Sequence, residues 1–185
     1  LLQCTDPGIF YPAETSRRAD GEILFVGNSR NVHRPAVAAA LAAGRDVAVY
    51  GTRWESLIDP RYIKAANVPN EGVGDLYRQA GVVLNDHWPD MRRAGILSNR
   101  VFDVLACGTP IVSDEIADLP SGFSTFVETF GPGRPIGAAI DRALAESPER
   151  RAERLAFSAI LRRDHSFDRR AEVILARLRA IPRQA

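Results

Sequence analysis

Short apolar segments alternate with helical patterns along most of the chain. The first apolar run covers residues 23–26 and ends at Gly27, as a buried strand that enters a tight turn would. Strands are expected on this basis at residues 23–26, 46–51, within 63–68, at 82–84, at 111–113 and, more weakly marked, at 125–127. The segments between these strands are expected to form helices and loops.

Helical patterns separate the expected strands at residues 35–43, 75–80 and 99–107. The first begins with Pro35, which suits the first turn of a helix, and is followed by Gly44, which suits the end of one. Ser98 can cap the third. This alternation of strands and helices predicts an α/β fold, a Rossmann-like parallel sheet in three layers with helices on both faces.

After about residue 134 only helices are expected, because the apolar residues recur at helical spacing. The three apolar stripes comprise Ile136, Ala139, Ile140, Ala143 and Leu144; Ala152, Leu155, Ala156, Ala159 and Ile160; and Phe167, Ala171, Ile174, Leu175 and Leu178. The chain is therefore interpreted as residues 1–20, a linker or N-terminal extension, residues 21–147, the Rossmann-like domain, and residues 148–185, helices that pack on it.

Composition agrees with one domain and a helical annex, since 185 residues with 45% apolar and 25% charged side chains are ordinary for a globular protein. No apolar run is long enough to span a bilayer. A net charge of +1 gives no case for nucleic acid. Two cysteines offer no metal-binding pattern, and a reduced, cytoplasmic setting is the default.

The charge is uneven, because residues 148–185 carry 10 arginines against 5 acidic side chains. The simplest interpretation is a solvated helix face. Contact with a domain outside this chain, or with an anionic membrane surface, is the alternative. The membrane alternative is the weaker one, since the helical stripes lack the large aromatic side chains that would anchor them.

Candidate chemistry lies just after the strands, because ligands bind beyond the carboxyl ends of a parallel sheet. The loop after the first strand runs from Gly27 to Arg34 and leads into a helix, so its amides can meet an anion. Arg30 and Arg34 can add charge against a phosphate. The loop matches neither the dinucleotide glycine motif nor a Gly-Lys phosphate loop.

A long polar segment follows the strand at 82–84. In it, His87 can form an acid/base pair with Asp86 or Asp90, or it can be a hydrogen-bonded loop histidine. The helix that starts after this segment carries Arg100 and Asp103, three residues apart and so adjacent on its polar side. A carboxylate there can accept hydrogen bonds from the two hydroxyls of a ribose.

Several of these residues belong to a segment that resembles a known family. Residues 103–113, Asp-Val-Leu-Ala-Cys-Gly-Thr-Pro-Ile-Val-Ser, resemble the Glu-Ala-x-Ala-x-Gly-x-Pro-Val-Val signature of group 1 glycosyltransferases of the GT-B fold. Asn-Arg-Val-Phe-Asp at residues 99–103 is similar to the spore-maturation-like branch. The opening residues resemble the family's interdomain linker. The resemblance implies a C-terminal, donor-binding domain and an acceptor-binding N-terminal domain outside this chain.

The resemblance also implies a role for each matching position. Asp103 stands where the family holds the donor ribose, with Arg100 beside it, and Asn67 and Val68 stand where it meets the base. The remaining positions form three groups: Gly95, Ile96, Leu97 and Ser98, whose amides meet the diphosphate; Gly27, Asn28 and Arg34, which face the phosphates from the other side; and His87, Asp90 and Arg92, at the sugar.

Two departures from the family stand out. Gly95 occupies the position of a family acid, and arginines replace a lysine after the first glycine turn. The stereochemistry, the base, the sugar and the acceptor therefore stay open. We expect transfer of a sugar from a nucleotide diphosphate sugar to an acceptor hydroxyl, without a cofactor or metal, with Arg30 and Arg34 stabilising the leaving diphosphate.

The chain begins at Leu1, and we expect it to be a fragment that binds donor but does not transfer sugar alone, with any catalytic base on the missing domain. A sugar-nucleotide epimerase of the same fold and a non-catalytic nucleotide-binding or interaction domain are the alternatives.

Overall fold

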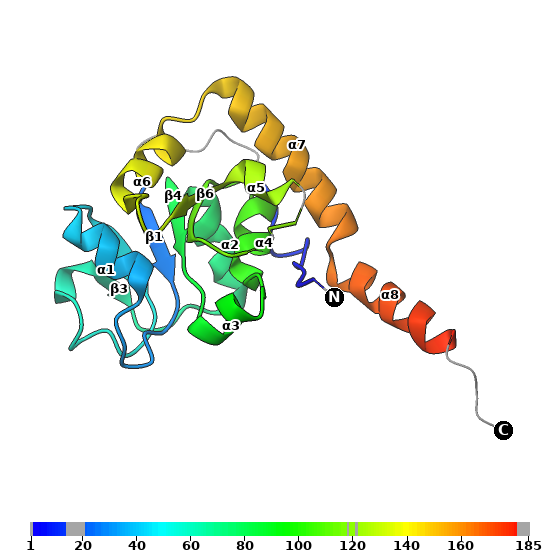
Figure 1. Ribbon diagram of the computed structural model, residues 1–185, viewed down its shortest axis with the longest axis horizontal. Coiled ribbons are helices and arrows are strands. Elements are labelled where there is room, and N and C mark those ends of the chain that lie inside the picture. The colour runs from blue at the N-terminus through cyan, green and yellow to red at the C-terminus, as the bar shows by residue number, and fades with distance from the viewer. Residues whose placement is uncertain (1, 14–20, 118, 121, 181–185) are drawn as a thin grey trace.

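The computed structural model, which describes residues 2–13, 21–117, 119–120 and 122–180, contains one sheet of six strands in the order β3-β2-β1-β4-β5-β6 (Figure 1). The strands are β1 (Ile23–Val26), β2 (Val47–Tyr50), β3 (Ile63–Ala65), β4 (Val82–Asn85), β5 (Ile111–Asp114) and β6 (Val127–Phe130). Every neighbouring pair is parallel. The predicted Rossmann-like α/β sheet is thus confirmed.

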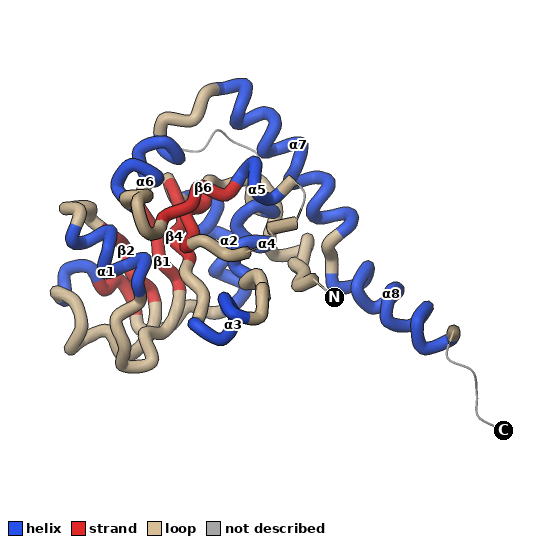
Figure 2. Tube along the Cα trace, viewed as in Figure 1, coloured by secondary structure: helices blue, strands red, loops and turns tan. Residues whose placement is uncertain are grey.

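Helices cover both faces of the sheet (Figure 2). The helices are α1 (Pro35–Ala42), α2 (Asn70–Gln79), α3 (Pro89–Arg93), α4 (Asn99–Ala106), α5 (Phe123–Phe126), α6 (Ile136–Leu144), α7 (Pro148–Asp164) and α8 (Phe167–Arg179), with a 3-10 turn at Pro60–Tyr62. Leu24 of β1 packs with α2 and α4, whereas its neighbour Phe25 packs with α1 and α6 on the opposite face. This alternation buries β1 on both sides, which explains its continuous apolar sequence.

The largest differences from the sequence prediction concern three regions. Helix α2 begins at Asn70 rather than at residue 75, and within this additional part the Gly74 backbone lies against Ile9 of the N-terminal segment. Thr125 and Phe126, expected in a strand, belong to α5, and β6 begins after them at Val127. Helix α3 lies in a segment that was expected to be a loop.

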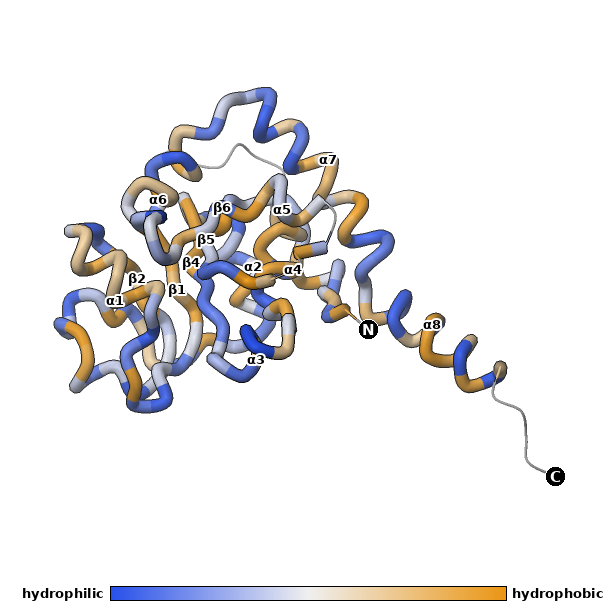
Figure 3. The backbone as a smooth tube through the Cα atoms, viewed as in Figure 1, coloured by the Kyte–Doolittle hydropathy of each residue, from blue (hydrophilic) through white to orange (hydrophobic). Residues whose placement is uncertain are grey.

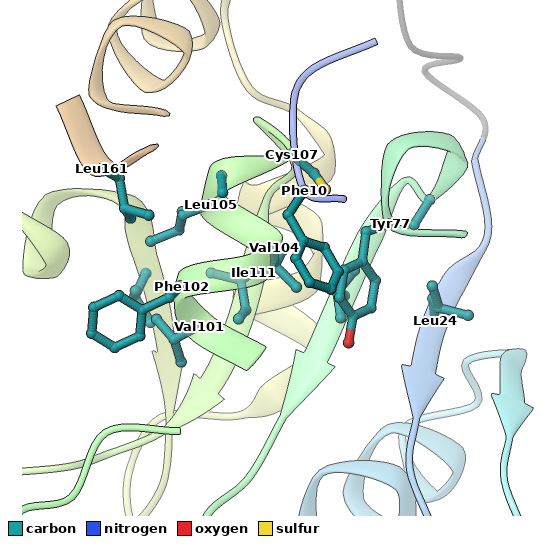
Figure 4. Packing of buried hydrophobic residues seen from close by; sticks show 14 of the residues in the cluster. Phe10, Leu24, Tyr77, Val101, Phe102, Val104, Leu105, Cys107, Ile111 and Leu161 are labelled. Atoms are coloured by element: carbon teal, nitrogen blue, oxygen red, sulfur yellow. The ribbon is translucent and has the colours of Figure 1, made fainter. Parts of the chain in front are cut away.

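The N-terminal segment 2–13 is part of the packed domain. Phe10 is 6% exposed and stacks on Tyr77 of α2, with 5.9 Å between the ring centroids (Figure 4). Thr5 pairs with Ser166 at the junction of α7 and α8. Residues 14–20 of the predicted linker lie outside the described residues.

Helix α7 buries polar side chains instead of its predicted apolar stripe. Ser158 donates to the Ala106 carbonyl oxygen over 2.7 Å, and Arg154 donates to the Gly108 carbonyl oxygen and to Glu146. The end of α4 leaves these carbonyl groups without partners in its own helix, so donors from α7 are buried against it. The stripe at Ala152, Ala156, Ala159 and Ile160 is exposed.

Helix α8 projects away from the sheet domain and has no buried residue over 167–179 (Figure 3). Its apolar stripe faces solvent, with Phe167, Ile174, Leu175 and Leu178 each between 45% and 58% exposed. The stripe predicted from the sequence therefore exists, but nothing in the described part of this chain covers it.

Candidate functional site

A cavity of about 210 Å³ opens at the carboxyl ends of β1 and β4. The strand order reverses between these two strands, because the chain continues from β1 to β2 on one side and returns through β4 on the other. Such a switch point is where open parallel sheets bind ligands. The cavity is lined by Gly27, Asn28, Arg30, Arg34, Asp86, Trp88, Met91, Ser98 and Arg100.

The β1–α1 loop is pinned to the loop that follows β2. Asn28 Oδ1 accepts a hydrogen bond of 2.8 Å from the Thr52 amide, and Ser29 Oγ donates to the Arg53 carbonyl oxygen. Arg30 and Asn31 adopt left-handed backbone conformations, with φ of 56° and 62°. Such conformations in residues other than glycine persist only where surrounding contacts hold them. The loop is thus a fixed wall of the cavity.

Arg34 is buried and paired. Its guanidinium forms an ion pair with Asp86 and donates to the Asp86 carbonyl oxygen over 3.1 Å. The second carboxylate oxygen of Asp86 accepts the amide of Ala36 over 3.0 Å, so Asp86 occupies the N-terminus of α1 that the sequence offered to an anion. Burial lowers the pKa of the Arg34 guanidinium, and Asp86 opposes this shift.

Arg100 joins the ends of β1 and β4. It donates to Asn85 Oδ1 over 2.9 Å and to the Val26 carbonyl oxygen over 2.5 Å. A Cβ atom at Gly27 would lie 2.8 Å from the Arg100 guanidinium, so a larger residue there would require Arg100 to shift. Among the described residues no ion pair joins Arg100 to Asp103, although the two are three residues apart on α4.

Arg30 carries the most available charge in the cavity. Its guanidinium stacks over the ring of Trp88 at 4.9 Å, and that of Arg34 lies over the same ring at 4.4 Å. Arg30 is exposed, and within the described residues it has no ion pair. Three arginines therefore line a cavity in which Asp86 is the only carboxylate, and Asp86 is already paired with Arg34.

His87 pairs with neither Asp86 nor Asp90. Its Nδ1 lies 2.7 Å from Asp114 Oδ1, and its Nε2 lies 3.0 Å from the amide nitrogen of Ser98. Of the two alternatives that the sequence left open, His87 is thus the hydrogen-bonded loop histidine, and its carboxylate partner lies at the end of β5. The signal that could have found Asp114 is its position, since it ends β5 as Asn85 ends the neighbouring β4.

The amides of residues 95–98 are mostly engaged. Gly95 donates to the Arg92 carbonyl oxygen and Ile96 to that of Met91, while Ser98 donates to His87. Within the described residues the Leu97 amide is left without a hydrogen-bond acceptor. Gly95 has φ of 62°, a conformation that disfavours the acid found there in the family.

Asp103 lies on α4 outside the cavity lining. Its Oδ1 accepts a hydrogen bond of 2.7 Å from the Thr5 hydroxyl. Burial raises the pKa of the Asp103 carboxyl to about 7, the bond from Thr5 and the charge of Arg100 lower it, and Asp6 raises it further. The carboxyl therefore titrates near neutrality.

The other nominated residues are more dispersed. Asn67 is exposed and Val68 half-buried, both between β3 and α2, and neither lines the cavity. Asp90 and Arg92 lie on α3, where Arg92 approaches Asp114 to 3.7 Å and lines a larger, separate cavity of about 870 Å³. The structure thus brings the residues after β1 together with the start of α4 around the cavity. Residues 67, 68, 90 and 92 lie outside the cavity lining.

The described residues contain neither a metal-binding cluster nor a membrane-spanning helix. No three histidine, cysteine or acidic side chains gather as they would around a metal ion. None of the described helices has the length and apolar character needed to cross a membrane.

Comparison with known proteins identifies the family to which the chain belongs. A family model described as glycosyl transferase-like matches residues 29–176, whereas a search of curated proteins finds no match. Among solved structures, sucrose-phosphate synthase from Thermosynechococcus elongatus is similar, with a TM-score of 0.64 and 15% identity, over 96% of this chain and 51% of that chain. AviGT4, a glycosyltransferase involved in avilamycin A biosynthesis, has a TM-score of 0.54 and 20% identity, over 89% and 57%. These identities show a shared fold, and the chain spans about half the length of either structure.

Proposed function

The chain belongs to the glycosyl transferase-like family, and we propose that it is the donor-binding half of a glycosyltransferase. It binds a nucleotide diphosphate sugar, and the complete protein transfers the sugar to an acceptor hydroxyl. The observation that carries this proposal is the cavity at the strand switch point, where Arg30, Arg34 and Arg100 outnumber the single carboxylate of Asp86. A diphosphate supplies the negative charge that this lining lacks.

We propose contacts for each part of the donor. The diphosphate meets Arg30 and the amides of Asn28 and Leu97, which have no hydrogen-bond acceptor within the described residues. The ribose hydroxyls meet Asp103. The base lies toward residues 67–68, and the sugar lies toward α3 with Asp90 and Arg92.

The proposed chemistry is stabilisation of a leaving group. As the bond to the sugar breaks, negative charge grows on the diphosphate, and preorganised cationic groups favour that charge most in the transition state. Arg30 and Arg34 supply the positive charge, and we propose that no metal ion is required. Chelation with EDTA is then expected to leave the affinity for nucleotide unchanged.

The acceptor site and any catalytic base lie in the other half of the protein. The exposed apolar side of α8 is the surface that this half would cover, since Phe167, Ile174, Leu175 and Leu178 are each at least 45% exposed. A cytoplasmic location fits Cys4 and Cys107, which are both free and buried. The isolated chain is expected to bind donor without transferring sugar, and efficient transfer by it would contradict this assignment.

Calorimetry of the chain with UDP, GDP, dTDP and ADP and their sugars tests the proposal. One nucleotide is expected to bind, and Arg30→Gln is expected to weaken it at least about tenfold, because that side chain has no other ionic partner to replace. Arg169→Gln is the matched control, since this exposed arginine pairs with Glu172 on α8, away from the cavity. Equal affinity in wild type and Arg30→Gln, or no binding by the complete protein, would refute donor binding at this site.

A further inference from the structure

His87 connects the end of β5 with the start of α4. It follows β4, its ring lies 2.7 Å from Asp114 at the end of β5, and its other nitrogen lies 3.0 Å from the amide of Ser98, which caps α4. Asp114 also accepts the backbone amide of His87 over 3.1 Å. The His87 side chain is fully buried and that of Asp114 is 7% exposed.

These contacts determine the protonation of the imidazole. A backbone amide can only donate, so Nε2 must be unprotonated to accept from Ser98. A carboxylate accepts, so Nδ1 carries the proton and donates it to Asp114. His87 is therefore a neutral imidazole with both nitrogens engaged. It has no free nitrogen with which to act as a general acid or base.

We propose that Asp114 and His87 are positioning residues that hold the start of α4 in the geometry required for donor binding. The anchored Ser98 lines the cavity, and Arg100 in the first turn of the same helix reaches Asn85 and Val26 from it. The Leu97 amide, which has no hydrogen-bond acceptor within the described residues, directly precedes Ser98. The proposal rests on the proposed donor site, and it adds a residue of β5 that does not line the cavity.

Two other side chains of the described residues also face Asp114. It receives the Ser113 hydroxyl at 3.3 Å and faces Arg92 of α3 at 3.7 Å. A proton on His87 Nε2 would direct an N–H group at the N–H group of Ser98, so the anchor requires the Nδ1-protonated tautomer.

Two variants separate positioning from general stability. His87→Ala leaves the Ser98 amide without an acceptor and is expected to weaken nucleotide binding by about tenfold or more. In His87→Gln the side-chain carbonyl can accept from Ser98, so this variant is expected to keep an affinity close to that of the wild type. The exposed His33→Gln is the matched control.

The tautomer provides a test that needs no nucleotide. Long-range proton–nitrogen NMR spectra of the chain at neutral pH should show His87 protonated at Nδ1 only, and Asp114→Asn should change that signal. A proton on Nε2 would overturn the proposal. So would equal affinity of wild type and His87→Ala for UDP, GDP, dTDP or ADP, or a loss in His87→Gln as large as in His87→Ala, with donor binding itself left standing. Failure of all four to bind would refute the donor site, and the NMR result would still decide the tautomer.

Discussion

Replacing Asp103 by asparagine should change how the stability of this protein depends on pH. Burial raises the pKa of the Asp103 carboxyl from 3.8 to about 7, since the charged form is poorly solvated on α4. In the unfolded chain the carboxyl keeps its ordinary pKa. The folded protein therefore binds this proton more tightly than the unfolded protein does.

The sign and the size of the effect follow from this difference. The stabilising contribution of protonated Asp103 is fully present below about pH 4 and is lost as the pH rises through about 7. Each pH unit within that window is worth about 1.4 kcal/mol. Between pH 5 and pH 7 the wild-type free energy of unfolding should thus fall by about 2 kcal/mol relative to Asp103→Asn, which does not titrate, because the slope flattens as the folded carboxyl reaches half ionisation.

Urea unfolding of both proteins from pH 5 to pH 8 measures this difference directly. Thr5→Val should extend the fall to higher pH, because the Thr5 hydroxyl bond lowers the pKa of Asp103, and Thr5→Ser should keep the wild-type behaviour. A difference between wild type and Asp103→Asn that stays constant across this range would refute the buried, neutral-titrating carboxyl.

Three further predictions concern packing. Arg154→Ala should lower the free energy of unfolding by about 3–5 kcal/mol, because Glu146 is left buried and unpaired, and adding Glu146→Ala should recover part of the loss in urea unfolding. Phe10→Ala should lower it by about 3 kcal/mol, measured the same way, whereas a loosely attached N-terminal segment would give almost no change. Gly51→Ala would place a Cβ atom 2.3 Å from the Gly27 carbonyl oxygen, so calorimetry should show weaker nucleotide binding and thermal unfolding a lower Tm.

Strands β1, β2 and β4 were predictable because each contains a continuous apolar run next to turn residues, whereas β3 and β6 carry polar residues and were marked more weakly. The helices of the sheet domain were predictable where a cap or a glycine marks them, as Ser98 and Gly44 do. Helix α3 was not, because it is five residues long and almost wholly polar. The burial of α7 was not predictable either, since Arg154 and Ser158 are buried by acceptors on α4 that local sequence does not reveal.

Seven of the nine cavity-lining residues were named from the sequence: six follow β1 or begin α4, and Asp86 was a possible partner of His87. Trp88 and Met91 lie in the polar segment after β4 and had no distinguishing pattern. Asp114 ends a different strand, and its pairing with His87 depends on β4 and β5 lying side by side.

The sequence by itself determined the parallel sheet, the position of the cavity at its carboxyl edge and the family, since these depend on periodicity and on local motifs. The tertiary structure decided which charges remain available. It paired Arg34 with Asp86, engaged the Ser98 amide with His87, and left Arg30 without an ionic partner among the described residues. The reason is physical: hydrogen bonds between residues 52 or 27 positions apart form only when the strands that carry them become neighbours.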